Sequence, residues 1–487
     1  MKGCAGRPFF CRTLGRDWLV VPFELFCGFC GWASGREEPI HEITLNEAKP
    51  VLSVSCCFVF FPGSHEAVSW IVTLVIMNSA LKIATSNIHR TSCCVVGAGP
   101  AGAVLSLLLA RAGIEVTLLE AHQNFDRDFR GDTIHPSVLH IMDEIGLADR
   151  LLQLRHSRIH TASFATPSGT IAIADFRRVE SKFPFIMMVP QELFLEFITQ
   201  EAKQYPTFRL IMGANVQEMI EENGTIQGVR YRSGDEWDEV RATLTVAADG
   251  RSSRIRKLSG LESVKTSPPM DVLWFRIPRE QDDPAGILAQ FGRGHALILL
   301  DRLTQWQVAF LILKDTWSQV RAAGIEKFRA SVSELMTEFP ERIEHLREWK
   351  QVSVLSVESS RLLQWYQPGL LLIGDAAHVM SPVGGVGINY AIQDAVVAAN
   401  VLAPSLRRGV VTVEDLRNVQ KEREFPTRVI QWIQTQVQKR IVAAALRSPD
   451  TLQVPWLLRL LLRLPIIMNI PARIIAHGVR RVHVNVR

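Results

Sequence analysis

The feature that most constrains the fold is a glycine loop set between two apolar runs near residue 100. The run Thr91 to Val96 leads into Gly97-Ala98-Gly99-Pro100-Ala101-Gly102, and good helix formers follow as far as Ala110. A second apolar run, Ile114 to Leu119, ends on Glu120. This order of strand, glycine loop, helix, strand and acid is typical of a dinucleotide site.

Each residue type in this first glycine loop (residues 97–102) has a physical reason. Gly97 permits a tight turn, Gly99 lets the backbone approach a pyrophosphate, and Gly102 lets the helix pack closely on the sheet. The helix N-terminus favours negative charge, and Glu120 is placed to accept from a ribose hydroxyl. These features fit FAD and NAD equally well.

Two further strings lie downstream. The apolar run Leu370 to Ile373 leads into GDAAHVMSPVGGVGINYAIQDA at 374–395, and VAADGRSSR occupies 246–254. Small residues at the start of the helix that follows let backbone amides approach a ligand. Asp375, at a strand end, can bond a ribityl or ribose hydroxyl.

These two strings closely resemble the later fingerprints of the class A flavin-dependent monooxygenases, the group of para-hydroxybenzoate hydroxylase. The resemblance covers roughly residues 90–430 and includes three motifs in the correct order. It implies FAD as the cofactor and NAD(P)H as a co-substrate. The first motif would hold the ADP part of FAD, and the Gly-Asp motif would hold the ribityl chain and the flavin ring.

Position by position, the resemblance assigns cofactor-binding roles and no catalytic side chain or metal ligand. The assigned residues are Gly97, Ala98, Gly99, Pro100, Ala101, Gly102, Glu120, Arg130, Gly131, Gln191, Val216, Asp249, Asp375, Pro382, Gly385, Val386, Gly387, Ile388 and Asn389. His135 and His378 also lie in these motifs, and we interpret both as structural.

The expected fold is α/β: a Rossmann-like FAD-binding domain with an inserted mixed β-sheet substrate domain and C-terminal helices. We expect a leader at 1–89, FAD-binding parts at 90–154, 191–261 and 350–405, substrate-sheet segments at 155–190 and 262–349, and a helical region at 406–487. Strand-like runs occur at 161–165, 170–174, 272–277, 296–300 and 306–313, and 325–349 is predicted helical.

Large apolar side chains in the substrate segments could line a pocket, although core packing is the favoured interpretation for any one of them. They are Phe176, Met187, Met188, Trp274, Phe291 and Trp306.

Charge and cysteine content limit the partners and the compartment. The net charge is +5, and residues 455–487 hold six arginines without Asp, Glu or Lys, so the rest is nearly neutral and a nucleic-acid partner has no support. All eight cysteines lie at or before Cys94, which suits a reducing, cytoplasmic setting. Cys27 and Cys30 form a lone CxxC without a second spaced pair for zinc.

Both ends of the chain leave two interpretations open. We expect residues 1–76 to be an extension foreign to the fold. The alternative is a membrane anchor at 67–81, although those fifteen residues are shorter than the ~20 of a spanning helix. The apolar, arginine-rich stretch 456–479 either packs on the body or makes peripheral contact with an anionic membrane.

The resemblance implies an FAD-dependent monooxygenase. NAD(P)H would reduce FAD, dioxygen would give a flavin C4a-hydroperoxide, and one oxygen atom would hydroxylate or epoxidise an aromatic or unsaturated small molecule. Two alternatives are a flavin-dependent reductase or dehydrogenase of an isoprenoid-type substrate and a non-catalytic flavin-binding protein. A halogenase is disfavoured, because its W-x-W-x-I-P string is replaced by Leu273-Trp274-Phe275-Arg276-Ile277-Pro278.

Overall fold

A computed structural model describes residues 9–12, 18–21, 87–126, 133–166, 169–284, 286–292, 294–336, 338–447 and 465–486. The chain divides into two units, Met1–Thr85 and Ser86–Arg487. In the first unit, β1 (Phe9–Arg12) pairs antiparallel with β2 (Trp18–Val21). The predicted CxxC and the apolar run 67–81 lie outside the described residues.

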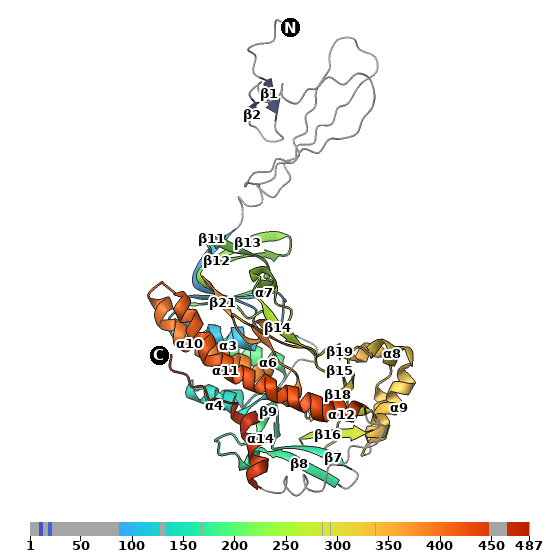
Figure 1. Cartoon of the computed structure of the whole chain (residues 1–487). Coiled ribbons are helices and arrows are strands. Elements are labelled where there is room, and N and C mark those ends of the chain that lie inside the picture. The colour runs from blue at the N-terminus through green and yellow to red at the C-terminus, as the bar shows by residue number, and fades with distance from the viewer. Residues whose placement is uncertain are drawn as a thin grey trace, which may run out of the picture. The chain divides into compact units, whose positions relative to one another are not determined.

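The second unit, shown in Figure 1, contains an eight-stranded sheet in which five strands run parallel, and one of these, β3, leads directly into the first glycine loop. The parallel strands are β10 (Phe208–Met212), β4 (Val116–Glu120), β3 (Ile88–Val96), β13 (Glu236–Ala247) and β22 (Leu370–Leu372). The centre of this sheet is buried on both faces, which explains the continuous apolar runs in β3, β4 and β22. Strand β3 begins three residues before the predicted run.

Strand β13 changes neighbour along its length. Its N-terminal half continues the antiparallel meander of β11 (Asn215–Glu222) and β12 (Thr225–Ser233), while its C-terminal half pairs with β22, which a short strand, β21 (Tyr366–Gln367), flanks. Helix α3 (Pro100–Arg111) packs on this sheet, and α6 (Gln191–Ala202) and α10 (Gly387–Arg407) pack against α3, with α11 (Val413–Val437) against α10.

A second, seven-stranded sheet contains strands from both predicted substrate segments. Its order is β19 (Ser353–Leu355), β15 (Met270–Pro278), β18 (Gln305–Leu313), β17 (His295–Asp301), β16 (Ile287–Gly292), β7 (Thr161–Thr166) and β8 (Gly169–Asp175). It is mixed, because β16 and β7 run parallel while the other pairs are antiparallel. The predicted fold class is therefore confirmed, and β16 is a strand that the sequence analysis missed.

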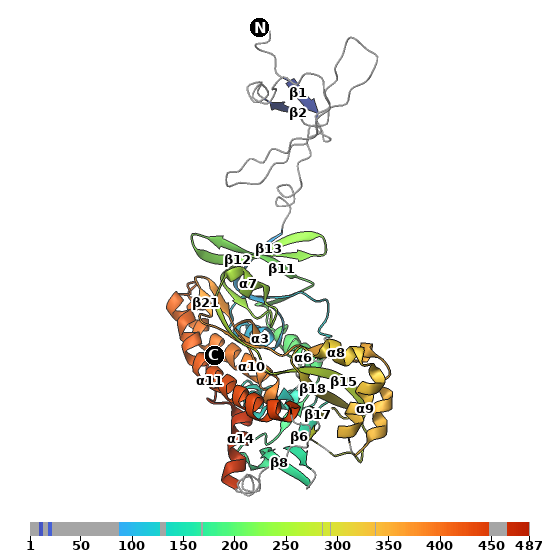
Figure 2. The ribbon, with the colours of Figure 1, turned by 45° about the vertical axis from the view of Figure 1, so that its right-hand side comes forward.

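Side chains alternate between the two faces of this second sheet. Leu273, Phe275 and Phe310 point to an outer core that α9 (Ile325–Leu335) covers, beside α8 (Trp317–Ala322) (Figure 2). Met270, Val272, Trp274 and Phe291 belong to the opposite, inner face. Of the six pocket candidates, Trp274 and Phe291 lie on the inner face and Trp306 lies in the outer core, stacked on Phe339. Phe176, Met187 and Met188 are buried in other core clusters, as the packing interpretation expects.

The helix predicted at 325–349 is shorter than expected. It ends at Leu335, and Pro340–His345 and Trp349–Gln351 form 3-10 turns instead. Proline at position 340 cannot continue an α-helical hydrogen-bond ladder, which accounts for the break.

Two small sheets and the C-terminal helices complete the unit. The first sheet joins β14 (Ser263–Thr266), β20 (Ser359–Leu362) and β23 (His378–Val379), and the second joins β5 (Thr133–Ile134), β9 (Ile186–Met188) and β6 (Ser157–Ile159). In sequence, α4 (Pro136–Glu144) and α5 (Ala148–Leu151) lie between β5 and β6, and α7 (Arg254–Ser259) precedes β14. After α11, a π-helical turn (Gln438–Val442) leads into α12 (Ala443–Arg447), and α14 (Pro465–His477) packs against β8 and α4.

Candidate functional site

The first glycine loop has the geometry that its sequence predicts. Gly97 adopts φ +98°, a region that favours glycine, and a Cβ there would lie 2.5 Å from the carbonyl oxygen of Ala248. A Cβ on Gly102 would lie 2.0 Å from the carbonyl oxygen of Gly97. Gly99 differs, because its Cβ would meet nothing in the described structure nearer than 4.0 Å. The protein therefore requires glycine at 97 and 102, and it leaves open space beside Gly99.

Glu120 fastens this loop to the end of β4. Its buried carboxylate accepts hydrogen bonds from the backbone N–H of Ala98 (2.9 Å) and from the backbone N–H of His122 (3.1 Å). The Nδ1 of His122 lies 2.6 Å from the same carboxylate. Glu120 thus stands directly beside the loop, where a ribose of a dinucleotide would reach it.

Asp249, from the second motif, caps α7. Its carboxylate accepts from the Ser253 hydroxyl (2.5 Å) and from the backbone N–H groups of Arg254 (2.8 Å) and Ile255 (3.1 Å). Burial raises the pKa of Asp249, although these hydrogen bonds oppose the rise. The described contacts of this carboxylate therefore organise the motif itself, and a role toward FAD stays a prediction.

Arg256 connects the second motif to the third, and the sequence analysis missed it. Its Nη1 donates to the carbonyl oxygens of Asp375 (2.9 Å) and Ala376 (3.1 Å), and its Nη2 donates to the carbonyl of Arg251. Arg256 stands two residues after the string VAADGRSSR at 246–254, and no local pattern indicated that it reaches the third motif.

The second glycine loop (residues 381–389) is held in part by its own Asn389. The Nδ2 of Asn389 donates to the carbonyl oxygens of Thr133 (3.0 Å) and Gly385 (3.2 Å), and its Oδ1 accepts from the backbone N–H of His135 (2.8 Å). The Thr133 hydroxyl donates to the same Gly385 carbonyl (2.9 Å). These bonds bring β5, which follows Arg130 and Gly131 in sequence, to the loop.

A buried ionic cluster lies behind this loop. The carboxylate of Asp394 accepts from the backbone N–H of Gly374 (3.0 Å) and from Arg423 Nε (2.7 Å), and it lies 2.6 Å from His378 Nε2. Burial alone would raise the pKa of Asp394, but His378 and Arg423 outweigh it and lower this pKa. His378 is therefore a structural partner of Asp394, as we interpreted it, and Arg423 is a contact that the sequence analysis missed.

The other predicted residues fall in three places. Arg130 and Gly131 lie outside the described residues. Val216 is buried on β11, two residues after Ala214, whose N–H donates to the carbonyl oxygen of Glu120 (2.8 Å). Gln191 is the first residue of α6, which packs against α3.

The residues present fit FAD. Helices α3 and α10 both begin at a glycine loop, and in the described structure neither has a side chain capping its first turn. Their N–H groups are available to an anion or to a ring carbonyl. The open space beside Gly99 gives a pyrophosphate room to approach, and α10 is joined to Gly374 through Asp394. Both loops therefore present backbone N–H groups of the kind that a dinucleotide requires.

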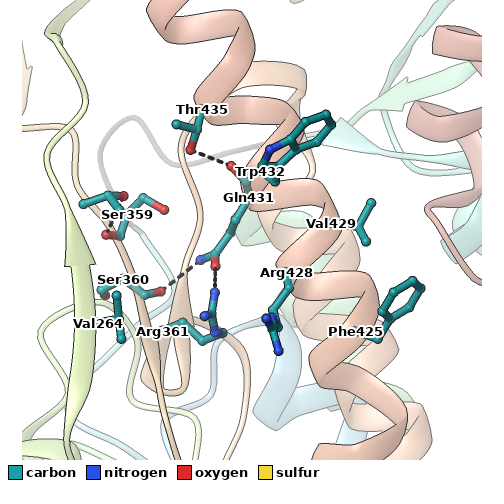
Figure 3. Close-up of a pocket in the computed structure, with 11 residues that line it drawn as sticks. Val264, Ser359, Ser360, Arg361, Phe425, Arg428, Val429, Gln431, Trp432 and Thr435 are labelled. Carbon is teal, nitrogen blue, oxygen red and sulfur yellow. Dashed lines mark hydrogen bonds between the residues drawn. The ribbon is translucent and has the colours of Figure 1, made fainter.

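A separate groove of about 750 Å³ lies between α11 and the β14–β20 edge (Figure 3). Phe425, Arg428 and Trp432 line its helical side, and Val264 and Arg361 lie opposite. None of the described residues assigned to the cofactor lines it. Burial and the nearby Arg428 lower the pKa of Arg361.

Two features of the described residues concern metal binding and membrane spanning. No group of three His, Cys, Asp or Glu side chains there could hold a metal ion. One segment there, Val383–Arg407, has the length and hydropathy of a membrane span, and 78% of its most apolar window is buried inside the protein. This segment is α10 with the turn before it, so it is a core helix of the unit.

Comparisons with known proteins agree with this geometry. The family model described as "FAD binding domain" matches residues 90–433. The 6-methylpretetramide 4-monooxygenase of Streptomyces rimosus is 32% identical over 322 residues, which are 66% of this chain and 77% of that protein. Para-nitrophenol 4-monooxygenase of Pseudomonas sp. (strain WBC-3) is 24% identical, covering 65% of this chain and 79% of its own. The crystal structure of p-nitrophenol 4-monooxygenase PnpA from Pseudomonas putida DLL-E4 aligns with TM-score 0.64 and 18% identity, over 80% of this chain and 100% of that one.

The fold, the paired glycine loops and the fit to FAD define an FAD-dependent oxidoreductase. The chain belongs to the FAD-binding-domain family, and within it to the class A flavin-dependent monooxygenases.

Proposed function

We propose that this enzyme hydroxylates an electron-rich aromatic small molecule that lies between the second glycine loop and the inner face of the seven-stranded sheet. One observation carries the proposal: Val383, in the loop, packs in the same apolar cluster as Trp274, Phe291 and Ile298 on that face. An aromatic substrate in this cluster would be dry and close to the flavin ring.

Two polar atoms on the inner face of the seven-stranded sheet would orient the substrate. Trp274 Nε1 and Gln307 Oε1 are buried and have no hydrogen-bond partner among the described residues. Trp274 pairs with Ala309, and Gln307 pairs with Arg276, so both side chains lie on one face in diagonal positions. A buried donor and a buried acceptor left open together suit a substrate that carries hydroxyl or carbonyl groups.

In this proposal, different groups of the assigned residues bind different parts of FAD. The first glycine loop and Glu120 would hold the ADP part of FAD, and residues 382–389 with Asp375 would hold the ribityl chain and ring. Arg130, Gly131, Gln191, Val216 and Asp249 complete this proposed set. FAD supplies the redox chemistry when bound, with NAD(P)H as reductant, while the chain positions both partners and excludes water.

Relatives favour an aromatic substrate. Two of them are named as monooxygenases of 6-methylpretetramide and para-nitrophenol. An enzyme of this kind consumes dioxygen with its substrate, whereas a reductase of an isoprenoid chain does not.

The test uses the full-length protein. We expect it to purify yellow, with FAD that acid or heat releases. NADH and NADPH are then compared in anaerobic stopped-flow reduction of the flavin, with and without a panel of phenols and polyketide-like quinones. Faster reduction with one compound, followed by a product carrying one added oxygen atom, supports the proposal. Product without dioxygen consumption would favour the reductase, and an unreducible flavin would favour a binding protein.

The location of the enzyme is a further part of the proposal: cytoplasmic, with peripheral contact to an anionic membrane. Residues 425–447 contain no Asp or Glu, and Arg428, Lys439, Arg440 and Arg447 are all exposed. Phe425 and Trp432 are 67% and 63% exposed on the same stretch. This mixture of aromatic and basic residues suits a membrane surface better than the described part of the Arg-rich C-terminus, α14, which packs on the body.

Vesicle flotation tests this contact. The protein should float with phosphatidylglycerol vesicles and not with phosphatidylcholine vesicles, and a Phe425→Ala/Trp432→Ala variant should lose this binding. Val410→Ala, at another exposed apolar residue, is the control. Unchanged flotation of the double variant would rule out this face.

A further inference from the structure

Gln434 makes an unusual pair of contacts with the second glycine loop. This buried side chain lies on α11, and its Nε2 donates to the carbonyl oxygens of Ser381 (2.9 Å) and Val383 (2.8 Å). Two acceptors require both amide hydrogens, so the orientation of the amide is fixed. Its own Oε1 has no hydrogen-bond partner among the described residues. Both N–H groups of the Gln434 amide are therefore used by the loop, while its oxygen accepts no hydrogen bond from the described residues.

Neighbouring glutamines extend the same contact. Gln438, one turn later, donates to the Ser381 hydroxyl. Gln431, one turn earlier, donates to the carbonyl oxygen of Ser360 (3.0 Å), as Figure 3 shows, and also to the carbonyl oxygen of Val379 (3.2 Å). Spacings of three and four residues place the three side chains on one helix face. Strand β23 ends at Val379. After β23 ends, the side-chain amides of these glutamines therefore donate the hydrogen bonds that the main-chain carbonyl groups accept.

The loop needs such a restraint. Gly384 and Gly385 have φ of +81° and +62°, so the chain passes through two consecutive residues that have wide conformational freedom. The carbonyl of Gly385 is held from the other side by Thr133 and Asn389. Gln434 is the matching contact on the α11 side.

The contact also determines where one N–H group points. In a planar trans peptide, the C=O and N–H groups point in opposite directions. Because the carbonyl of Val383 faces Gln434, the N–H of Gly384 points away from α11. An amide that points out of a glycine loop at a helix start is the kind of donor that a flavin ring carbonyl accepts.

We propose that Gln434 is a positioning residue for the flavin, acting through the Val383–Gly384 peptide. The inference rests on the proposed placement of FAD against the second glycine loop. Gln434 itself does not contact the cofactor; it determines which direction the loop amide faces.

The main test compares Gln434→Leu with Gln420→Leu in the full chain. Gln420 is a buried glutamine on the same helix; its Nε2 donates to the carbonyl of Leu363 (2.9 Å), and its Oε1 accepts from the N–H of Trp365 (3.0 Å), outside all three motifs. We expect both variants to lower the unfolding temperature of the apoprotein. Only Gln434→Leu should weaken FAD binding, roughly tenfold by fluorescence titration, and change the visible spectrum of the bound flavin.

Gln434→Glu provides a second test that does not depend on the leucine variant folding. An ionised carboxylate cannot donate to the two carbonyls, whereas a protonated one donates to one of them. FAD affinity of this variant, relative to the wild type at the same pH, should therefore recover as the pH falls. Wild-type FAD affinity and spectrum in Gln434→Leu, an equal loss in Gln420→Leu, or no pH recovery in Gln434→Glu would overturn the inference. A wild-type protein that binds no FAD would instead refute the proposed function.

Discussion

Arg256 and Asp375 are 119 residues apart in sequence, yet Arg256 Nη1 donates a hydrogen bond to the main-chain carbonyl of Asp375 at 2.9 Å. The same nitrogen reaches Ala376, so one guanidinium holds two successive peptide groups of the Gly-Asp motif. An arginine just after the second motif therefore holds the main chain of the third motif.

Replacing Arg256 should misplace Asp375. Arg256→Met leaves these carbonyls without their charged donor, and we expect FAD to bind roughly tenfold more weakly, since a hydrogen bond to a charged group contributes about 1.5–3 kcal/mol. Fluorescence titration of the apoprotein measures this. Arg254→Met is the control, because Arg254 donates to Gln217 on the exposed side of the motif. Equal losses in both variants would contradict the assignment.

Glu120→Ala should weaken FAD binding and leave the protein folded. The variant loses a ribose acceptor of about 1.5–3 kcal/mol, and it also frees the N–H of Ala98 within the first glycine loop. Titration with FAD and thermal unfolding of the apoprotein separate the two effects. Wild-type FAD affinity would show that Glu120 supports the loop and does not bind the cofactor.

Two glycines of the first loop should respond differently to alanine. The nearest atom to a methyl group on Gly99 would be the carbonyl oxygen of Ala248 at 4.0 Å, an ordinary contact distance, so Gly99→Ala should fold normally and lose FAD affinity. On Gly102 the methyl would lie 2.0 Å from a backbone oxygen, so Gly102→Ala should destabilise the apoprotein by about 1–3 kcal/mol or more. Circular dichroism melts with FAD titration check both, and a stable Gly102→Ala protein would contradict the close packing of α3.

Stability should fall in acid because of His135. Burial lowers the pKa of this side chain to about 4, below its ordinary value of 6.5, although a hydrogen bond to the Ile475 carbonyl opposes the shift. In the unfolded chain His135 therefore binds a proton below pH 6.5, whereas in the folded chain it binds one only below about pH 4. Above pH 6.5 His135 is neutral in both states and does not lower the free energy of unfolding. As the pH drops from 6.5 to 4, His135 lowers the free energy of unfolding by up to about 3 kcal/mol.

Urea unfolding at several pH values measures this slope. His135→Gln should flatten it in part. Burial lowers the pKa of His477 to about 4 as well, with help from Arg481 and His140, so a residual slope is expected. A slope unchanged by the substitution would assign the acid response to other groups.

Deleting residues 1–76 should leave FAD content, thermal stability and NAD(P)H oxidation almost unchanged. The chain divides after Thr85, and the first strand of the FAD-binding sheet begins at Ile88. Size-exclusion chromatography and flavin absorbance of the truncated protein provide the measurement. Loss of folding would show that the leader packs on the domain, and a shift from membrane to soluble fractions would favour the anchor at 67–81.

The sequence by itself determined the cofactor and the class. Three local strings were sufficient, because glycines at this spacing before a helix N-terminus can be recognised from neighbouring residues alone as a phosphate- or flavin-binding pattern. Local patterns also identified most strands of the second sheet, because short, largely apolar runs such as those of β15, β17 and β18 are typical of buried strands.

Only the tertiary structure showed which distant residues contact the three motifs. Arg256, Asp394, Arg423 and Gln434 reach partners in the third motif or behind it over separations of 16 to 120 residues, and no local pattern fixes such contacts. The same holds for the pocket candidates: Trp274 and Trp306 both looked suitable, and only the register of β15 with β18 assigned them to opposite faces. A side chain points to the inner or outer face according to its parity in the paired strand, and the partner strand determines which face meets the second glycine loop.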